Sequence, residues 1–196
     1  NFKEDNSRNM NVLIVQPNVD PYIDKFSKGY QVQLIDFITL VKTKINEETR
    51  LLLAPETALL EEIWEDKIEE SYSIMMLREL QKDFPDLNIL IGANTYKIFR
   101  DSYNKTNTAR RIKNENIFYD VYNSAIFIPD SGSIRIYHKT KLVPGVEKMP
   151  FPKILDPLAK LAVNLGGTSG SLGSVNYLNS FLVDKSIVSP LICYES

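Results

Sequence analysis

The chain has 196 residues, of which 43% are hydrophobic and 24% are charged. This composition is typical of a globular domain with its own core, and it excludes a disordered or low-complexity chain. The 23 basic and 25 acidic side chains give a net charge of −2, so the sequence lacks the basic excess that is typical of nucleic-acid-binding proteins.

The first half of the chain alternates between predicted strands and predicted helices. An apolar run predicts a buried strand at 12–15, and apolar residues at helical spacing predict a helix over 31–45. A second buried strand is expected at 51–54, followed by another helix over 66–82 and a third strand over 87–96. The inward face of the 66–82 helix is expected to contain Ile68, Tyr72, Met75, Met76 and Leu80.

The second half is predicted to consist of hairpins and loops. Residues 100–118 are charged and rich in Asn, which indicates an exposed insertion. Its basic residues Arg110, Arg111 and Lys113 allow contact with anionic lipid headgroups, although a solvated loop is the favoured interpretation. The glycine-rich segment 166–173 lacks the lysine of a phosphate-binding loop and is interpreted as a mobile loop or turn. Strand pairs joined by turns are expected at 122–128 with 134–137, and at 177–183 with 187–192.

This order of elements predicts an α/β domain with a mixed sheet. Residues 1–10 are polar and contain no signal-peptide core, and no run approaches 18 apolar residues. The chain stops at Ser196, directly after an apolar run. We interpret the sequence as a piece of a longer protein at both ends.

The counts of two residue types restrict the chemistry. Cys193 is the single cysteine, which excludes an intramolecular disulfide and a cysteine-rich metal site. His138 is the single histidine, which excludes multi-histidine metal centres. The sequence therefore predicts no metal and no cofactor, and an enzyme of this composition is expected to use a carboxylate base and a lysine cation.

Polar residues follow several predicted strands at the points where these strands end. Glu56 follows the strand at 51–54, Lys139 follows the 134–137 strand, and Cys193 follows the last strand. Glu147 comes shortly after a turn at residues 144–145. Because active sites of open α/β sheets form where strand ends meet loops, these side chains are expected to converge on one pocket.

Each of these residues also has a plain structural interpretation. A lone cysteine after an apolar strand is usually a small core residue, and Glu56 after a proline can simply cap a helix. Lys139 lies in a short charged stretch that is typical of a solvated surface. The case for a site depends on the residues occurring together.

The combination of a thiol, a carboxylate and a lysine predicts acyl transfer through a thioester. The thiolate is the nucleophilic form of Cys193, and Glu56, which we expect to be desolvated between sheet edges, is expected to take the thiol proton. Lys139 and the backbone amide of Tyr194 are expected to stabilise the oxyanion that forms when a carbonyl is attacked.

The sequence resembles the nitrilase superfamily, and within it the bacterial apolipoprotein N-acyltransferases, from about Asn11 to Ser196. The motifs that carry the resemblance are Pro55-Glu56-Thr57-Ala58, Tyr122-Asn123-Ser124-Ala125, Tyr137-His138-Lys139, and Cys193-Tyr194-Glu195, with Val15-Gln16-Pro17-Asn18 and the stretch 139–150 for the narrower family. The resemblance implies a nitrilase-like α-β-β-α sandwich that is incomplete at its C-terminal side. Residues 1–10 are then a lead-in from a preceding membrane region, and 11–196 are a partial catalytic domain.

The same resemblance implies a function for the matched residues. Glu56 is the implied general base, Lys139 the oxyanion and charge stabiliser, and Cys193 the nucleophile, while Glu147 supports the triad and Tyr194 and Glu195 lie beside the nucleophile. The implied reaction takes an acyl chain from a phospholipid, through the cysteine thioester, to the N-terminal amine of a diacylglyceryl-cysteine lipoprotein. The implied location is the periplasmic face of the bacterial inner membrane, reached through helices outside this chain, with no nucleic-acid partner.

Two alternatives compete with this interpretation. A soluble nitrilase-type amidase or hydrolase uses the same Glu-Lys-Cys triad, and membrane helices encoded before Asn1 would exclude it. A non-catalytic binding module, in which Cys193 is a core residue, is favoured if a Cys193→Ser variant keeps full function.

Overall fold

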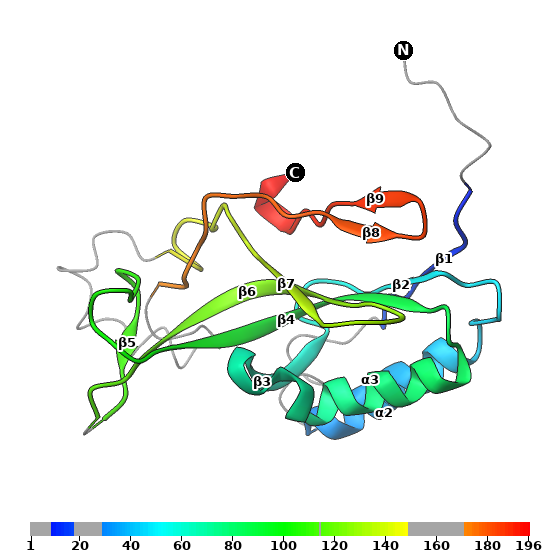
Figure 1. The fold of residues 1–196 in the computed structure, drawn as a ribbon, viewed down its shortest axis with the longest axis horizontal. Helices are drawn as coiled ribbons and strands as arrows, with labels where there is room; N and C mark the ends of the chain where they lie inside the picture. The colour runs from blue at the N-terminus through cyan, green and yellow to red at the C-terminus, as the bar shows by residue number, and fades with distance from the viewer. Residues whose placement is uncertain (1–8, 18–28, 114, 149–170) are drawn as a thin grey trace, which may run out of the picture.

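The computed structural model describes residues 9–17, 29–113, 115–148 and 171–196. The centre of this described part is a seven-stranded mixed sheet, with two helices against one face and a two-stranded hairpin on the other side (Figure 1). The strands run in the order β1-β2-β4-β6-β5, while β3 also pairs with β4 and β7 with β6.

The sheet has a parallel half and an antiparallel half. The parallel strands are β1 (Val12–Ile14), β2 (Leu51–Leu53), β3 (Leu59–Trp64) and β4 (Asn88–Phe99). The antiparallel strands are β5 (Arg110–Arg111), β6 (Phe118–Ile128) and β7 (Arg135–His138). β6 pairs with β4 from Phe118 to Ile128, and this long pair joins the two halves.

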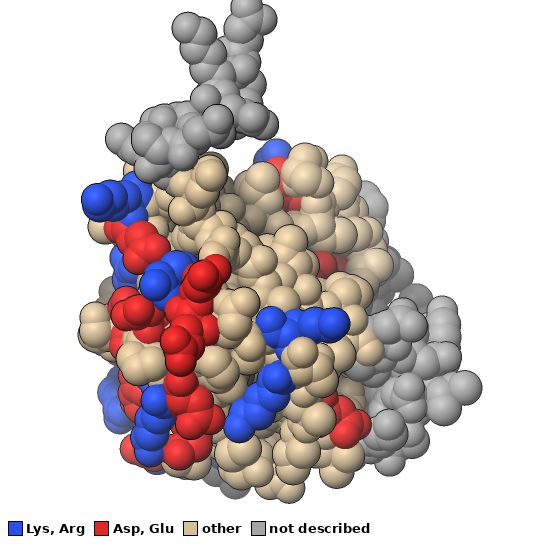
Figure 2. All heavy atoms as spheres, turned by 90° about the vertical axis from the view of Figure 1, so that its right-hand side faces the viewer, with Lys and Arg blue, Asp and Glu red and all other residues tan. Residues whose placement is uncertain are grey.

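Two helices, α2 (Tyr30–Lys42) and α3 (Tyr72–Asp83), lie side by side on one face of the sheet. The Lys42 ammonium lies 3.4 Å from the carboxylate of Asp83 on the neighbouring helix. Figure 2 shows acidic and basic side chains next to one another on the side of the molecule that it faces. The charges there are largely balanced over short distances.

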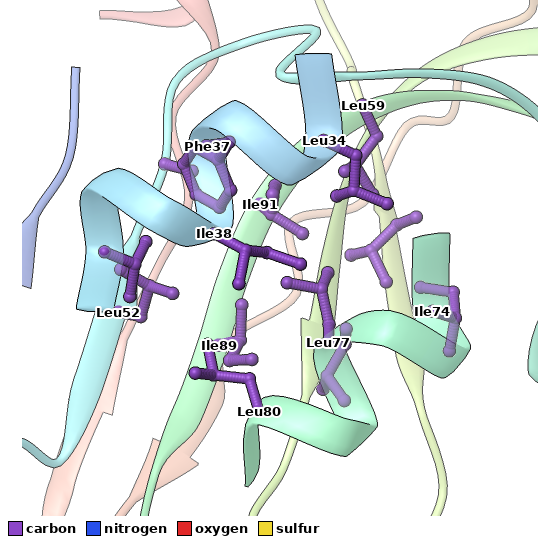
Figure 3. Close-up of a cluster of buried hydrophobic side chains, with 14 of the residues drawn as sticks. Leu34, Phe37, Ile38, Leu52, Leu59, Ile74, Leu77, Leu80, Ile89 and Ile91 are labelled. Carbon is purple, nitrogen blue, oxygen red and sulfur yellow. The ribbon is translucent and has the colours of Figure 1, made fainter. Parts of the chain in front are cut away.

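The inward faces of α2 and α3 form the main hydrophobic core with the sheet (Figure 3). The helices follow the 3.6-residue period of their apolar residues, and the strands supply alternate side chains to the same layer. The buried side chains include Leu34, Phe37, Ile38 and Val41 of α2, Ile74, Leu77 and Leu80 of α3, and Leu52, Ile89 and Ile91 of the sheet.

A second, smaller core lies on the opposite face of the sheet. The hairpin of β8 (Phe181–Val183) and β9 (Ser186–Val188) packs there, on the side away from the helices (Figure 1). The rings of Phe127 and Phe181 stack with centroids 4.7 Å apart. This core consists of Leu51, Leu90, Ala125, Phe127, Tyr137, Phe181, Val183 and Ile192.

The predicted fold class is confirmed, as an α/β domain with a mixed sheet and flanking helices. The hairpins predicted at 122–128 with 134–137 and at 177–183 with 187–192 are present, although β8 and β9 are shorter than expected. β3 was not predicted. The start of α3 depends on this strand, because Glu61 of β3 accepts hydrogen bonds from the backbone N–H groups of Tyr72 (2.9 Å) and Ser73 (2.6 Å).

Two expectations drawn from the apolar pattern are wrong. β1 is not buried, because it lies at the edge of the sheet, with Val12 42% and Ile14 70% exposed. The helix expected over 66–82 is divided, because Ser71 is extended between a short 3-10 helix (Glu65–Glu70) and α3. α3 therefore buries Ile74 and Leu77, and Met75 is exposed.

Several sequence predictions fall outside the described residues. These are most of the 1–10 lead-in, the motif residues Asn18, Met149 and Pro150, and residues 166–170 of the glycine-rich segment. Within the described part, no helix combines the length and the hydropathy needed to cross a bilayer.

Candidate active site

Lys139 lies at the centre of a charged cluster on the hairpin side of the sheet. It directly follows β7, and its backbone N–H donates to the Asn123 carbonyl of β6 (2.9 Å). Its side chain has no exposed surface, and its Nζ lies 2.9 Å from Glu147 Oε1 and 3.2 Å from Glu56 Oε1. A lysine from one strand end and two carboxylates from separate loops are thus brought together.

Glu147 is the more buried of the two carboxylates, with 11% of its side chain exposed. Its Oε2 accepts a hydrogen bond from the backbone N–H of Val143 (2.8 Å). Burial raises the pKa of Glu147, but the hydrogen bonds from Val143, Lys139 and Asn123 outweigh burial and hold it below its ordinary value. Both the carboxylate and its lysine partner are therefore charged at neutral pH.

The pKa of Lys139 is shifted in the complementary direction. Burial lowers it, but the hydrogen bond to Glu147 and the negative charges of Glu56 and Glu147 together raise it above the ordinary value. Lys139 is accordingly protonated at neutral pH.

Glu56 lies at the open side of the cluster, in the turn after β2. Its side chain is 35% exposed, so the expectation of a desolvated carboxylate is wrong for this structure. The turn lies against β4 at Gly92, whose N–H donates to the Pro55 carbonyl (3.2 Å), and Thr57 adopts a positive φ of 55°. The turn thus places the Glu56 carboxylate between Lys139 and solvent.

Asn123 of β6 is a member of the cluster to which the sequence gave no role. It is 4% exposed, and its Nδ2 donates to Glu56 Oε1 (2.5 Å) and Glu147 Oε1 (2.8 Å). Its Oδ1 is buried and has no hydrogen-bond partner among the described residues. The available signal was its place in the motif Tyr122-Asn123-Ser124-Ala125, which contributes to the family resemblance.

Cys193 opens a single 3-10 turn (Cys193–Glu195) rather than ending a strand as expected, because β9 stops at Val188. It is exposed and has a positive φ of 47°, which is uncommon for a residue other than glycine. Cys193 and Glu56 line the same cavity of about 310 Å³ between the sheet and the hairpin. The other lining side chains are mainly apolar and include Leu53, Leu90, Ala125, Val188, Leu191 and Ile192.

Glu195 anchors the segment that carries Cys193. Its carboxylate is 9% exposed and accepts hydrogen bonds from the Tyr137 hydroxyl (2.5 Å), the backbone N–H of Thr140 (2.6 Å) and the backbone N–H of Ile192 (2.9 Å). Burial raises the pKa of Glu195, but these hydrogen bonds outweigh it and lower the pKa below its ordinary value. Tyr194, which lies between Cys193 and Glu195, is 58% exposed.

His138 takes no part in this cluster, because neighbouring residues of a strand point to opposite faces of the sheet. Its Nε2 lies 2.6 Å from Glu65 Oε1, and its ring stacks on Tyr122 with centroids 4.1 Å apart. The single imidazole thus contacts Glu65 and Tyr122 on the helix side of the sheet. The described ranges contain no group of three His, Cys, Asp or Glu side chains placed to hold a metal ion.

The comparisons with known proteins give one sequence relative and several solved structures. The chain is 25% identical over 205 residues to an apolipoprotein N-acyltransferase of Chlorobaculum tepidum, covering 98% of this chain and 36% of that protein. No protein-family model matches.

Two solved structures match 84% of the chain at 11% identity. One is a CN-hydrolase superfamily protein of Xanthomonas campestris with an arsenic adduct in its active site (TM-score 0.44, 48% of that chain covered). The other is a glutamine-dependent NAD⁺ synthetase of Acinetobacter baumannii (TM-score 0.43, 25% of that chain covered). The sequence relative confirms the predicted resemblance of this chain to the nitrilase superfamily, and within it to the apolipoprotein N-acyltransferases.

Proposed function

We propose that this chain carries the catalytic site of an acyltransferase that moves a fatty acyl chain from a phospholipid to the N-terminal amine of a diacylglyceryl-cysteine lipoprotein. The observation that supports this most directly is the cluster of Glu56, Lys139 and Glu147 beside an apolar cavity that Glu56 shares with Cys193. Acyl transfer of a fatty chain through a thioester requires a carboxylate base, a cation, a thiol and an apolar cavity.

In the first half-reaction, Glu56 takes the proton of the Cys193 thiol, and the thiolate attacks the ester carbonyl of the phospholipid. Lys139 and the backbone N–H of Tyr194 stabilise the oxyanion. When the ester bond breaks, the departing alkoxide takes the proton from Glu56 and leaves as a lysophospholipid alcohol. One carbon–oxygen bond is exchanged for the carbon–sulfur bond of the thioester.

In the second half-reaction, the amine of the lipoprotein attacks the thioester carbonyl through the same oxyanion. Glu56 accepts a proton from the attacking nitrogen and returns it to the sulfur as the carbon–sulfur bond breaks. The products are an amide and the free thiol. Glu147 holds Lys139 in place and charged throughout, since it binds the Nζ at 2.9 Å.

The apolar lining of the Cys193 cavity fits the acyl chain of such a donor. Phospholipid and lipoprotein substrates are found at membranes, so we place the working enzyme at the periplasmic face of the bacterial inner membrane. The chain spans 36% of its sequence relative, and the membrane attachment is assigned to parts of the protein outside this chain.

The test is the intact mass of the full-length protein after incubation with phospholipid vesicles. A gain of one acyl group is expected, which Cys193→Ala abolishes and Ser131→Ala, an exposed change in the β6–β7 turn, preserves. Absence of the adduct while the Cys193 thiol still reacts with iodoacetamide contradicts the proposal. Hydrolysis of small amides without such an adduct supports the soluble amidase instead.

A further inference from the structure

A second pocket, of about 610 Å³, lies on the sheet where β3, β4 and β6 meet the segment around β5. The proposed reaction uses none of its residues. The residues that line it are Glu62, Trp64, Tyr96, Arg110, Arg111, Ile112, Lys113, Tyr119 and Val121, and we call it the basic aromatic pocket.

Three aromatic rings form one wall of this pocket. The centroid of Trp64 lies 5.1 Å from that of Tyr96 and 5.8 Å from that of Tyr119, and the two tyrosine rings stack at 6.2 Å. Trp and Tyr are the side chains that proteins place where apolar and polar parts of a lipid meet. A wall of this kind suits a ligand that has an apolar portion as well as a charge.

The opposite lining is cationic. Arg110, Arg111 and Lys113 face a single carboxylate, that of Glu62, and none of the three forms an ion pair with an acidic side chain in the described part of the chain. The two arginines are held by backbone carbonyls, Arg110 by Ser171 (3.3 Å) and Arg111 by Glu115 (2.8 Å). Guanidinium groups that are positioned and not neutralised are suited to bind phosphate.

The segment that supplies these cations is largely exposed, as the sequence predicted, but it is attached to the sheet at two places. Asp120 of β6 is fully buried and accepts hydrogen bonds from the hydroxyls of Thr106 and Thr108. β5 pairs with β6 through Arg110 and Arg111. The backbone of both arginines is therefore fixed at the edge of the sheet, with the Arg110 side chain on the face of its partner Tyr119 and the Arg111 side chain on the opposite face.

The pocket lies on the same face of the sheet as the candidate active site. Tyr119, Val121 and Asn123 alternate along β6 and share one face, and Asn123 contacts Glu56 and Glu147. Tyr119 and Asn123 are four residue steps apart along the strand, which is roughly 13 Å. The pocket and the carboxylates are thus on the same side of the sheet.

We propose that the basic aromatic pocket binds the phosphodiester headgroup of a phospholipid, with the phosphate at Arg110 and Lys113 and the glycerol portion on the aromatic wall. This inference rests on the proposed function, because it assigns the headgroup end of the acyl donor. The shared chemistry is phosphate, and the aromatic wall favours a lipid over the free anion, which has no apolar surface to bury.

The experiment uses this 196-residue chain and the fluorescence of Trp64, which is the only tryptophan in it. The probes are dihexanoyl phosphatidylglycerol below its micelle concentration, inorganic phosphate, and an uncharged alkyl glucoside. We expect a saturable fluorescence change with the phospholipid, a dissociation constant at least tenfold weaker for inorganic phosphate, and no saturable change with the glucoside. Equal affinity for inorganic phosphate overturns the assignment to lipid, and so does saturable binding of the glucoside.

The matched variants separate the pocket from general charge effects. R110Q/R111Q is expected to weaken phospholipid binding at least tenfold, whereas K44Q/K82Q removes two exposed cations near the helices and leaves it unchanged. Equal affinity for the phospholipid in both double variants overturns the proposal. If R110Q/R111Q no longer gives the circular dichroism spectrum of the folded chain, Lys113→Gln provides a second test. Phospholipid binding by the protein with Cys193 intact, in the absence of any acyl adduct on that thiol, would show that the proposed function has failed while the pocket still binds lipid.

Discussion

At the scale of single residues, the candidate site depends on a lysine that has no exposed side-chain surface. A buried ammonium is costly unless its charge is compensated, and Lys139 is compensated by two carboxylates at 2.9 and 3.2 Å. Asn123 donates to both of these carboxylates and so fixes their separation. The cluster is accordingly a coupled unit, and removal of one member affects the others.

Replacing Glu147 with glutamine is expected to lower the free energy of unfolding at pH 7 by about 3 kcal/mol, because it leaves Lys139 buried with one carboxylate that is partly exposed. The matched control is Glu79→Gln, which breaks an exposed ion pair with Lys82 and is expected to cost less than about 1 kcal/mol. Urea unfolding of the variants measures both values, and equal costs would contradict this account.

The pH dependence of this pair follows from the two pKa shifts. Because the folded pKa of Glu147 lies below its ordinary 4.5, its contribution to stability is present above pH 4.5 and is lost as the pH falls through the folded value. Because the folded pKa of Lys139 lies above 10.5, its contribution is present below pH 10.5 and is lost as the pH rises through the folded value. In Glu147→Gln, the loss of stability in acid is therefore expected to be shallower than in the unaltered chain.

The sequence predicted the members of the cluster better than their environments. Glu56 and Lys139 were singled out because they follow strand ends and Glu147 because it follows a turn, and the structure brings both carboxylates into contact with Lys139. The exposure of Glu56 and the bridging role of Asn123 were not predicted. Both features depend on how the turn after β2 lies against β4 and β6. A local sequence pattern does not determine such a contact between distant segments.

At the scale of elements, β4 organises the site because it pairs with β2, β3 and β6. The turn that carries Glu56 passes directly over Gly92 of this strand. A Cβ at Gly92 would lie 2.5 Å from the Pro55 carbonyl oxygen and 2.7 Å from the Glu56 Cα, both of which are backbone atoms. The glycine is therefore required by the close approach of the turn.

Gly92→Ala is expected to displace the Glu56 turn, to lower the free energy of unfolding by about 1 to 3 kcal/mol, and to slow formation of the Cys193 acyl adduct. The control is Gly29→Ala, where the added Cβ meets nothing within 4 Å and the change in stability stays within about 1 kcal/mol. Urea unfolding and the mass assay provide the two measurements. An unaltered rate of adduct formation in Gly92→Ala would show that the turn does not position Glu56.

The elements with strong local signals were predicted, and those defined by their partners were not. α2 and the strand that became β4 have regular apolar patterns, so both appear near the predicted positions. β3 has two glutamates in its middle and is a strand because β4 offers it a parallel edge. The break at Ser71 likewise follows from the capping of α3 by Glu61, a contact across 11 residues.

At the scale of the whole molecule, the candidate site lies at the junction of two layers. The sheet and its helices carry Glu56 and Lys139, whereas Cys193 follows the hairpin on the other side (Figure 1). The hairpin is held by Phe181, whose ring stacks on Phe127, while the guanidinium of Arg135 lies 5.2 Å from the Phe181 centroid. The relative placement of thiol and carboxylate thus depends on the small core between hairpin and sheet.

Phe181→Ala is expected to lower the free energy of local unfolding of the hairpin by about 3 kcal/mol. The helical layer should stay folded, because the two hydrophobic cores lie on opposite faces of the sheet. Hydrogen exchange measures this directly, since the amides of β8 and β9 should lose protection while those of β4 keep it. Leu182→Ala, at a neighbouring position that is 59% exposed, is the matched control and should change protection by less than about 0.5 kcal/mol. Formation of the acyl adduct should slow in Phe181→Ala alone, because only that change releases the element that leads to Cys193. Equal loss of protection in β4 and the hairpin would instead mean that the two layers unfold as one unit, and that the hairpin does not position the thiol independently.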